Sequence, residues 1–289
     1  MPANVFEVDQ ATEVHYGQVA ARRTLSATSE AARRPTTVGR VKRPRGIPWR
    51  VMAHAARDEW ALRYRMADQP SRIRLAGVEL VLRDEWASPA IRQAIYEGWY
   101  ELPERTILER TLRPDDRYLE AGAGIGLVTT CACMIVGARN VIAYEADPRL
   151  AEQARETAAR NGFAAEVVNA ALGARDGEVA FHTSPDFWAS SLLPSPGAQE
   201  VRVPVRSFGD VLDAFRPTYL MIDIEGGEVE LLAPPLPDHV RAVCVETHPR
   251  VVDAEALQAM LLSLMATGFR LDLHESREGV AFLAREAGR

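Results

Sequence analysis

Apolar runs of strand length alternate with segments of helical periodicity from residue 117 to residue 284 of the chain. The strand-like runs are 117–121, 139–145, 164–169, 218–224 and 240–246. The segments with helical periodicity are 125–136, 148–161, 207–214, 227–233 and 253–267. Regular alternation of this kind predicts a parallel sheet with helices on both faces, which is the α/β class.

The last two strand-like runs, 269–274 and 279–284, lie too close together in sequence for a helical crossover. They therefore predict an antiparallel hairpin. Two more short strands are predicted at 178–182 and 200–205, on either side of a loop rich in Ser and Pro. The expected fold is a Rossmann-like, seven-stranded and mostly parallel sheet with an antiparallel C-terminal hairpin.

The first third of the chain has a different pattern. Residues 1–48 have no sustained periodicity, so we expect a flexible arm. Residues 49–112 predict an extension that contains an amphipathic helix at 49–67, a small hairpin at 73–82 and two short helices before residue 112. Residues 113–289 would then form the main α/β domain.

The charge of the chain is uneven. Residues 14–57 carry ten basic residues and one acid, a net charge of +9, within a chain whose net charge is −6. If residues 1–67 have a function, we expect them to contact an acidic partner or a second subunit. Because no aromatic residues are interleaved with the charges, the arm does not favour nucleic-acid binding.

Several classes of protein are disfavoured by composition. Lys42 is the only lysine, and it lies in a Pro- and Arg-rich tract, so chemistries that need a positioned lysine are poorly supported. No apolar run reaches 18 residues, and the N-terminus lacks the apolar segment of a secretory signal. The three cysteines form no metal-binding spacing, which predicts reduced thiols in a cytoplasmic protein.

The most informative motif is Tyr118-Leu-Glu-Ala-Gly-Ala-Gly-Ile-Gly126, an apolar run followed by three glycines and a helical segment. It predicts a strand, a tight turn that a ligand can approach, and a helix whose N-terminus faces that ligand. Nicotinamide dinucleotides and S-adenosylmethionine (SAM) are both bound at such turns, and a turn kept only for close packing is the structural alternative. The spacing is G-x-G-x-G, whereas the dinucleotide fingerprint is G-x-G-x-x-G.

Other residues expected at this ligand site end the predicted strands. Glu145 ends the second strand, 21 residues after Gly124, where an acid commonly binds ribose hydroxyls. Glu120, just before the glycines, is expected to organise the turn or meet an amino group. Asn169, with Ala170 beside it, either contacts an adenine edge or caps a turn.

Candidate catalytic residues follow two more strands. Asp223 and Glu225 end the strand at 218–224, and Glu246 and His248 end the strand at 240–246. Ligands bind at the carboxyl ends of parallel strands, so these side chains are expected to meet. We predict that His248 is a general base, assisted by Asp223 or Glu246, because histidine titrates near neutral pH. A divalent metal held by Asp223, Glu225 and His248 is a less favoured alternative to the general base, so we assign no metal ligands.

Residues 99–283 resemble the FkbM family of SAM-dependent methyltransferases. The matching pieces are Tyr100-Glu101, Leu119-Glu-Ala-Gly-Ala-Gly-Ile-Gly126, Ala143-Tyr-Glu-Ala-Asp-Pro148, Asn169-Ala-Ala-Leu-Gly173, Ile222-Asp-Ile-Glu-Gly-Gly-Glu228 and Val245-Glu-Thr-His248. Met221 departs from the family, which often has a lysine there. The resemblance implies that SAM is bound by Tyr100, Glu120, Gly122, Ala123, Gly124, Gly126, Glu145, Ala146, Asn169, Ala170 and Asp223.

The resemblance also implies O-methylation of a hydroxyl on a sugar, a glycan or a natural product. Two alternatives remain from other classes, a non-catalytic SAM-fold protein that serves as an assembly module and an NAD-dependent oxidoreductase. The C-terminal hairpin and the glycine spacing both disfavour the oxidoreductase. Phe187 and Trp188, in the loop at 183–199, are expected to line the acceptor pocket or to pack against the domain.

Overall fold

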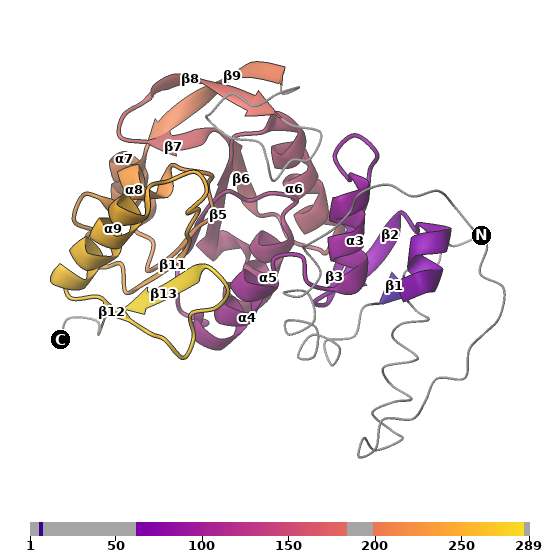
Figure 1. Ribbon diagram of the computed structural model, residues 1–289, viewed down its shortest axis with the longest axis horizontal. Helices are drawn as coiled ribbons and strands as arrows, with labels where there is room; N and C mark the ends of the chain where they lie inside the picture. Colours follow the sequence, from indigo (N-terminus) through magenta and orange to yellow (C-terminus); the bar gives the residue numbers. More distant parts are fainter. Residues whose placement is uncertain (1–5, 8–61, 184–198, 286–289) are drawn as a thin grey trace, which may run out of the picture.

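A mostly parallel seven-stranded sheet forms the centre of the protein in a computed structural model that describes residues 6–7, 62–183 and 199–285 (Figure 1). Its strands lie in the order β12-β13-β11-β10-β4-β5-β6. Their bounds are β4 (Tyr118–Ala121), β5 (Val141–Glu145), β6 (Glu166–Asn169), β10 (Tyr219–Ile222), β11 (Ala242–Glu246), β12 (Arg270–Leu271) and β13 (Val280–Ala284). The chain alternates between strands and helices as predicted, and the fold class is confirmed.

Strand β13 is inserted antiparallel between β11 and β12, and the remaining pairs of the sheet are parallel. The predicted C-terminal hairpin is therefore confirmed. Its first strand is only two residues long, and residues 272–279 form a longer connection than the short turn expected from the sequence.

Helices cover both faces of the sheet because strand side chains alternate between them. Tyr118 faces one buried cluster and Leu119 the other. The first cluster packs beneath α3 (Pro89–Glu97), α4 (Leu102–Thr111), α5 (Leu127–Val136) and α6 (Pro148–Arg160). The second packs beneath α7 (Phe208–Phe215), α8 (Glu228–Leu232) and α9 (Ala254–Ala266). A 3₁₀ helix, η2 (Ala138–Asn140), links α5 to β5.

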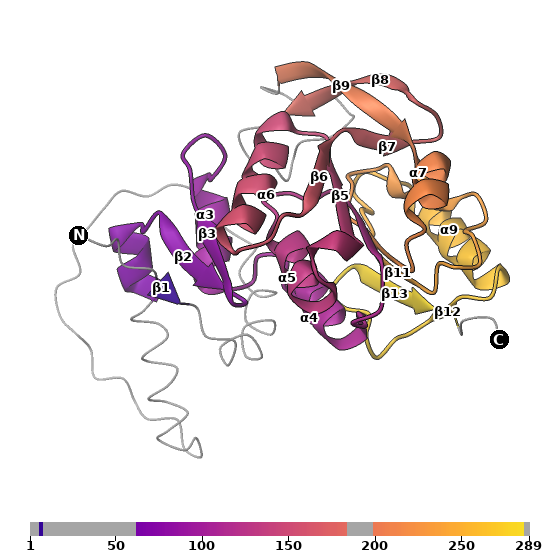
Figure 2. The same cartoon turned by 180° about the vertical axis from the view of Figure 1, so that it is seen from behind.

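The N-terminal extension packs into the same core as the sheet. The hairpin β2 (Arg72–Leu75) and β3 (Val78–Val81) lies beside α6 (Figure 2). Its apolar side chains are buried in the cluster that α5 also enters. Strand β1 (Phe6–Glu7) pairs in parallel with β2, so two residues of the expected flexible arm form a strand. The rest of that arm and residues 49–61 of the predicted helix lie outside the described residues, whereas residues 62–68 are helical as predicted.

A further three-stranded sheet, in addition to β1-β2-β3, lies beyond β6 (Figure 1). It consists of β7 (Ala171–Gly173), β8 (Gly177–Thr183) and β9 (Gln199–Ser207). The sequence predicted β8 and β9 but not the short β7. Phe187 and Trp188, expected near the acceptor, lie outside the described residues.

Two predictions from composition can be compared with the fold. All three cysteines are buried and free, as expected. Within the described ranges, the helices are all too short or too polar to cross a membrane.

Candidate active site

The glycine turn after β4 approaches backbone on two sides. Gly122 has a φ of 91°, and a side chain there would bring its Cβ to 1.8 Å from the carbonyl oxygen of Asp223. Gly126 has a φ of 79°, and its Cβ would lie 2.7 Å from the Cα of Ala154 in α6. Only glycine satisfies both the positive φ and these distances. The turn is therefore closely packed and also joins the end of β4 to the residue that follows β10.

Glu145 fixes the turn from the end of β5. One of its carboxylate oxygens accepts a hydrogen bond from the backbone N–H of Gly124 at 2.8 Å, and the other accepts from Asp147 N–H at 2.8 Å. Burial raises the pKa of Glu145 to about 7. Each carboxylate oxygen has a second lone pair, so these contacts leave room for ribose hydroxyls. The predicted cofactor role of Glu145 stays a prediction.

Tyr100 and Glu101 lie across the turn from Glu145. A Cβ on Gly124 would lie 3.3 Å from the Tyr100 hydroxyl and 3.2 Å from a carboxylate oxygen of Glu101. Glu101 has a left-handed φ of 49°, and its second oxygen, Oε2, is buried without a hydrogen-bond partner among the described residues. Burial raises the pKa of Glu101 well above its usual value. A strained residue with an unpartnered carboxyl oxygen beside a glycine turn fits a site for a cationic ligand, whose charge would favour the ionised form that burial disfavours.

Glu120 lies beneath the turn, facing α5. Its carboxyl group accepts a hydrogen bond from the Thr129 hydroxyl, and the residue is 2% exposed. Burial raises its pKa to about 8, so the group is mostly protonated at neutral pH. This geometry suits the predicted role of organising the turn.

His248 lies among four carboxylates at the carboxyl ends of β10 and β11. The register places Ile222 opposite Val245, which brings Asp223 and Glu246 next to each other. His248 Nε2 lies 3.6 Å from Asp223, 3.8 Å from Glu225 and 3.5 Å from Glu246. The sequence prediction that these four residues meet is therefore confirmed by the geometry.

Glu228 is the fourth carboxylate, and its position was not anticipated. The sequence suggests only that it interacts with the dipole of its helix. In the structure its Oε1 lies 3.3 Å from His248 Nδ1 and accepts a hydrogen bond from the His248 backbone N–H at 3.2 Å. The side chain is fully buried, and its Oε2 has no hydrogen-bond partner among the described residues.

The carboxylates determine the charge of His248. Burial by itself would lower the pKa of His248, but its interactions with Glu228, Glu246 and Glu225 outweigh this and raise the pKa to about 10. His248 is therefore a cation at neutral pH. The prediction that it acts as a general base relied on a near-neutral pKa, and that premise is wrong for this environment.

The pKa values of Asp223 and Glu246 are shifted in opposite directions. Burial and then the charge of Glu246 raise the pKa of Asp223 well above its usual value. Burial would also raise the pKa of Glu246, but interactions with His248 and with Asp223 hold it below its usual value. Asp223 therefore holds a proton more readily than Glu246 does.

Asn169, at the end of β6, holds the turn that follows β5. Asn169 donates hydrogen bonds from its amide to the carbonyls of Glu145 at 2.9 Å and Ala146 at 3.0 Å. Its amide nitrogen thus has the capping role that the sequence left open, while contact of Asn169 with an adenine stays a prediction. Ala123 and Ala170 are each 1% exposed, and their contact with the cofactor stays a prediction.

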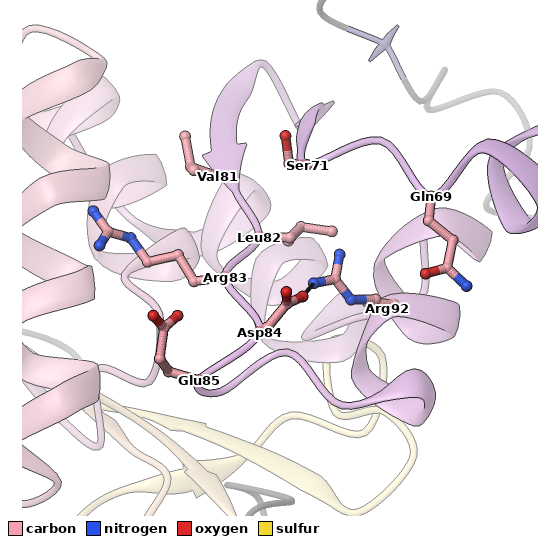
Figure 3. A pocket seen from close by; sticks show the side chains of 8 residues that line it. All are labelled: Gln69, Ser71, Val81, Leu82, Arg83, Asp84, Glu85 and Arg92. Carbon is pink, nitrogen blue, oxygen red and sulfur yellow. Dashed lines mark hydrogen bonds and ion pairs between the residues drawn. The ribbon is translucent and has the colours of Figure 1, made fainter.

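A hollow of about 490 Å³ lies elsewhere, at the N-terminal hairpin (Figure 3). Its eight lining residues all come from positions 69–92, and Arg92 points to Asp84 across it at 2.5 Å. None of them is a predicted site residue. The residues of the candidate site lie instead at the carboxyl ends of β4, β5, β10 and β11.

Comparison with known proteins identifies the domain. The model of the methyltransferase FkbM domain matches residues 120–271, more than half of the chain. Among curated proteins, none has a matching sequence.

Solved structures that match the chain include three methyltransferases. A ribosomal protein L11 methylase from Lactobacillus delbrueckii has 17% identity and a TM-score of 0.37, over 64% of this chain and 78% of that chain. A precorrin-6y C5,15-methyltransferase from Geobacter metallireducens has 14% identity and a TM-score of 0.37, over 64% and 88%. A TehB-like SAM-dependent methyltransferase from Corynebacterium glutamicum has 12% identity and a TM-score of 0.36, over 68% and 94%. Similarity at this level carries no information about the substrate.

Proposed function

Because the chain belongs to the FkbM family of methyltransferases, we propose that it transfers a methyl group from SAM to a hydroxyl of a sugar, a glycan or a natural product. The observation that carries this proposal is the contact between the glycine turn and the carboxylate–histidine cluster. Gly122 packs directly on the backbone of Asp223, so a ligand held by the turn ends beside the cluster. The cofactor and the acceptor hydroxyl would therefore meet at the ends of β4 and β10.

The residues around the turn fit SAM. This cofactor carries two positive charges, an ammonium and a sulfonium, and one carboxylate. Glu101 Oε1 lies 3.2 Å from the position of a Gly124 side chain and the Tyr100 hydroxyl lies 3.3 Å from it, while Glu101 Oε2 is buried without a partner among the described residues. Carboxylates form strong charge-assisted hydrogen bonds with ammonium groups. We assign Glu101 and Tyr100 to the methionine part and Glu145 to the ribose.

Bound SAM supplies an electrophilic methyl carbon. The acceptor oxygen forms the new bond to that carbon while the carbon–sulfur bond breaks and its electron pair stays on sulfur. The protein's part is to align the acceptor and exclude water, which can contribute about 7–11 kcal/mol. It must also take the proton that the hydroxyl loses.

The carboxylates of the cluster, rather than His248, are the groups available for that proton. His248 is already protonated at neutral pH, since its pKa is about 10. Its positive charge is held between the four carboxylates and orients them around the space where the hydroxyl would lie. Proton transfer by a positioned group of this kind typically accelerates a reaction about 10²–10⁴-fold.

Methyl transfer can be measured directly. The purified chain is incubated with SAM labelled in its methyl group and with a panel of sugars, oligosaccharides and hydroxylated natural products, and the products are analysed by mass spectrometry. We expect a methyl ether on at least one acceptor. His248→Gln should reduce the rate at least 10²-fold, and His274→Ala, which removes an exposed histidine in residues 272–279, should leave it unchanged. Labelling confined to nitrogen or carbon, or full activity in His248→Gln, would contradict the proposal.

A further inference from the structure

The cluster at the ends of β10 and β11 has the composition of a metal site. Two carboxylates and one imidazole, from Asp223, Glu246 and His248, present ligand atoms that all lie within 4.8 Å of one another. We propose that these three residues bind a divalent transition-metal ion, which receives the acceptor hydroxyl. This inference rests on the proposed function and specifies how the same site activates its acceptor.

The distances within the cluster suit an ion at its centre. His248 Nε2 lies 3.5 Å from Glu246 and 3.6 Å from Asp223. These separations are longer than the usual N–H···O distance of about 2.7–3.2 Å. Metal–ligand bonds of about 2.0–2.2 Å place neighbouring ligand atoms about 3–3.5 Å apart. A small contraction of the cluster therefore gives the spacing that an ion requires.

Glu228 provides a second, independent indication. A histidine that binds a metal usually has its other ring nitrogen held by a carboxylate or a carbonyl group, which fixes the orientation of the ring. Glu228 Oε1 lies 3.3 Å from His248 Nδ1, and this leaves Nε2 directed at Asp223 and Glu246. Glu228 is fully buried, and its Oε2 has no partner among the described residues. Without the ion, the positive charge of His248 offsets part of the negative charge of the four carboxylates. A divalent cation at Nε2 would displace the proton from that nitrogen and take over this role, so binding would release a proton.

The ligand set indicates the kind of ion. Imidazole favours Zn²⁺, Fe²⁺ and similar ions, whereas carboxylates favour Mg²⁺, Ca²⁺ and Mn²⁺. One imidazole with two carboxylates therefore fits Mn²⁺ or Zn²⁺ better than Ca²⁺. Three protein ligands leave coordination positions for water or for the acceptor, as catalytic metal sites do.

A metal ion here would make the hydroxyl more acidic. A Lewis acid lowers the pKa of an oxygen bound to it, so the hydroxyl loses its proton more readily. Glu225 lies outside the ligand set, with its carboxylate 3.8 Å from His248 Nε2. It is placed to take the proton as the oxygen bonds to the methyl carbon. Neither the metal nor the protein changes oxidation state.

Metal binding is tested on the full chain after treatment with a chelator. Mn²⁺ is titrated and followed by electron paramagnetic resonance, with Zn²⁺ and Ca²⁺ as competitors. We expect one Mn²⁺ per chain, displaced by Zn²⁺ more readily than by Ca²⁺, and a spin-echo modulation from a coordinated imidazole nitrogen. Asp223→Asn should weaken binding at least tenfold, Glu228→Gln should weaken it about 10–100-fold, and His274→Ala should bind as the wild type does.

The outcomes separate this inference from the proposed function. Melting temperatures of the variants identify any that fail to fold, and the nitrogen signal in the wild type does not depend on them. If no Mn²⁺ or Zn²⁺ binds, or if a folded Asp223→Asn binds Mn²⁺ as tightly as the wild type, the metal site is wrong. Methyl transfer to a hydroxyl that continues in excess chelator would also overturn it while leaving the proposed function intact. Conversely, metal binding without methyl transfer to any hydroxyl would contradict the proposed function and the metal's role in activating the acceptor, while the metal site itself would stand.

Discussion

Replacing Gly122 with alanine tests how the glycine turn joins the cofactor site to the cluster. Its φ of 91° is unfavourable for any L-residue, and a left-handed conformation costs about 1–2 kcal/mol. The new Cβ would also lie 1.8 Å from the carbonyl oxygen of Asp223, which is backbone and cannot move away by rotating a side chain. Overpacking of this kind costs about 1–3 kcal/mol more. We therefore expect Gly122→Ala to lose about 2–5 kcal/mol in total.

Gly162→Ala is the matched control. Gly162 has a φ of 85°, and an added Cβ would have no atom within 4 Å. It should lose only the conformational cost of about 1–2 kcal/mol. In a domain of this size each kcal/mol lowers Tm by about 2–4 °C. The control should therefore melt about 2–8 °C below the wild type, and Gly122→Ala about 4–20 °C below it.

Two measurements decide the outcome. Differential scanning calorimetry gives the melting temperatures, and isothermal titration gives the affinity for SAM. Gly122→Ala must displace Asp223 as well as the turn, so it should lose SAM affinity, whereas Gly162→Ala should keep it. Equal melting temperatures and equal SAM affinities for the two variants would refute the packing argument.

Three further predictions concern buried carboxylates. Asp116→Asn leaves the buried Arg241 guanidinium without its ion pair and should cost about 3–5 kcal/mol in urea unfolding. Burial opposes ionisation of Asp116, but the hydrogen bonds from Arg241 outweigh it and hold the pKa of Asp116 below the usual 3.8. The stability difference between the variant and the wild type should therefore be complete above that pH and shrink below it. A difference that does not depend on pH would contradict the reasoning. Burial raises the pKa of Glu120 to about 8 from 4.5, so ionisation of this group should lower the stability of the wild type across that pH range. The free energy of unfolding of Glu120→Gln, relative to the wild type, should therefore be higher at pH 9 than at pH 5. The same relative stability at both pH values would argue against this reasoning. Glu101→Gln should weaken SAM binding about 10–100-fold, since a charge-assisted hydrogen bond contributes about 1.5–3 kcal/mol, and unchanged affinity in a calorimetric titration would remove Glu101 from the cofactor site.

Much of the fold follows from the periodicity of the sequence. The helices and strands from β4 onward are regular, and the distance between the last two strands predicts their antiparallel pairing. Strand β7 was missed because three residues, Ala171–Gly173, are too few to show a pattern. It forms through pairing with β9, a contact between residues more than thirty positions apart in sequence.

Part of the candidate site could be predicted from the positions of its residues at strand ends. Asp223, Glu225, Glu246 and His248 end two strands, and parallel strands bring their carboxyl ends to one edge. Glu228 was assigned to its helix alone, because its contact with His248 depends on how α8 is placed against β11.

Burial is what the sequence could not provide. The prediction that His248 is a base uses the pKa of a histidine in water, and the surrounding carboxylates raise it to about 10. Glu101 lies more than twenty residues before Gly124 in sequence, and only the folded chain shows that its carboxyl group lies beside the glycine turn and has one oxygen without a partner among the described residues.

Binding of the cofactor tests the central claim most directly. SAM, its demethylated product and NAD⁺ are each titrated into the purified full chain by isothermal calorimetry. We predict that SAM and its product bind with one site per chain and that NAD⁺ gives no heat of binding. Binding of NAD⁺ with no binding of SAM or its product would contradict the account.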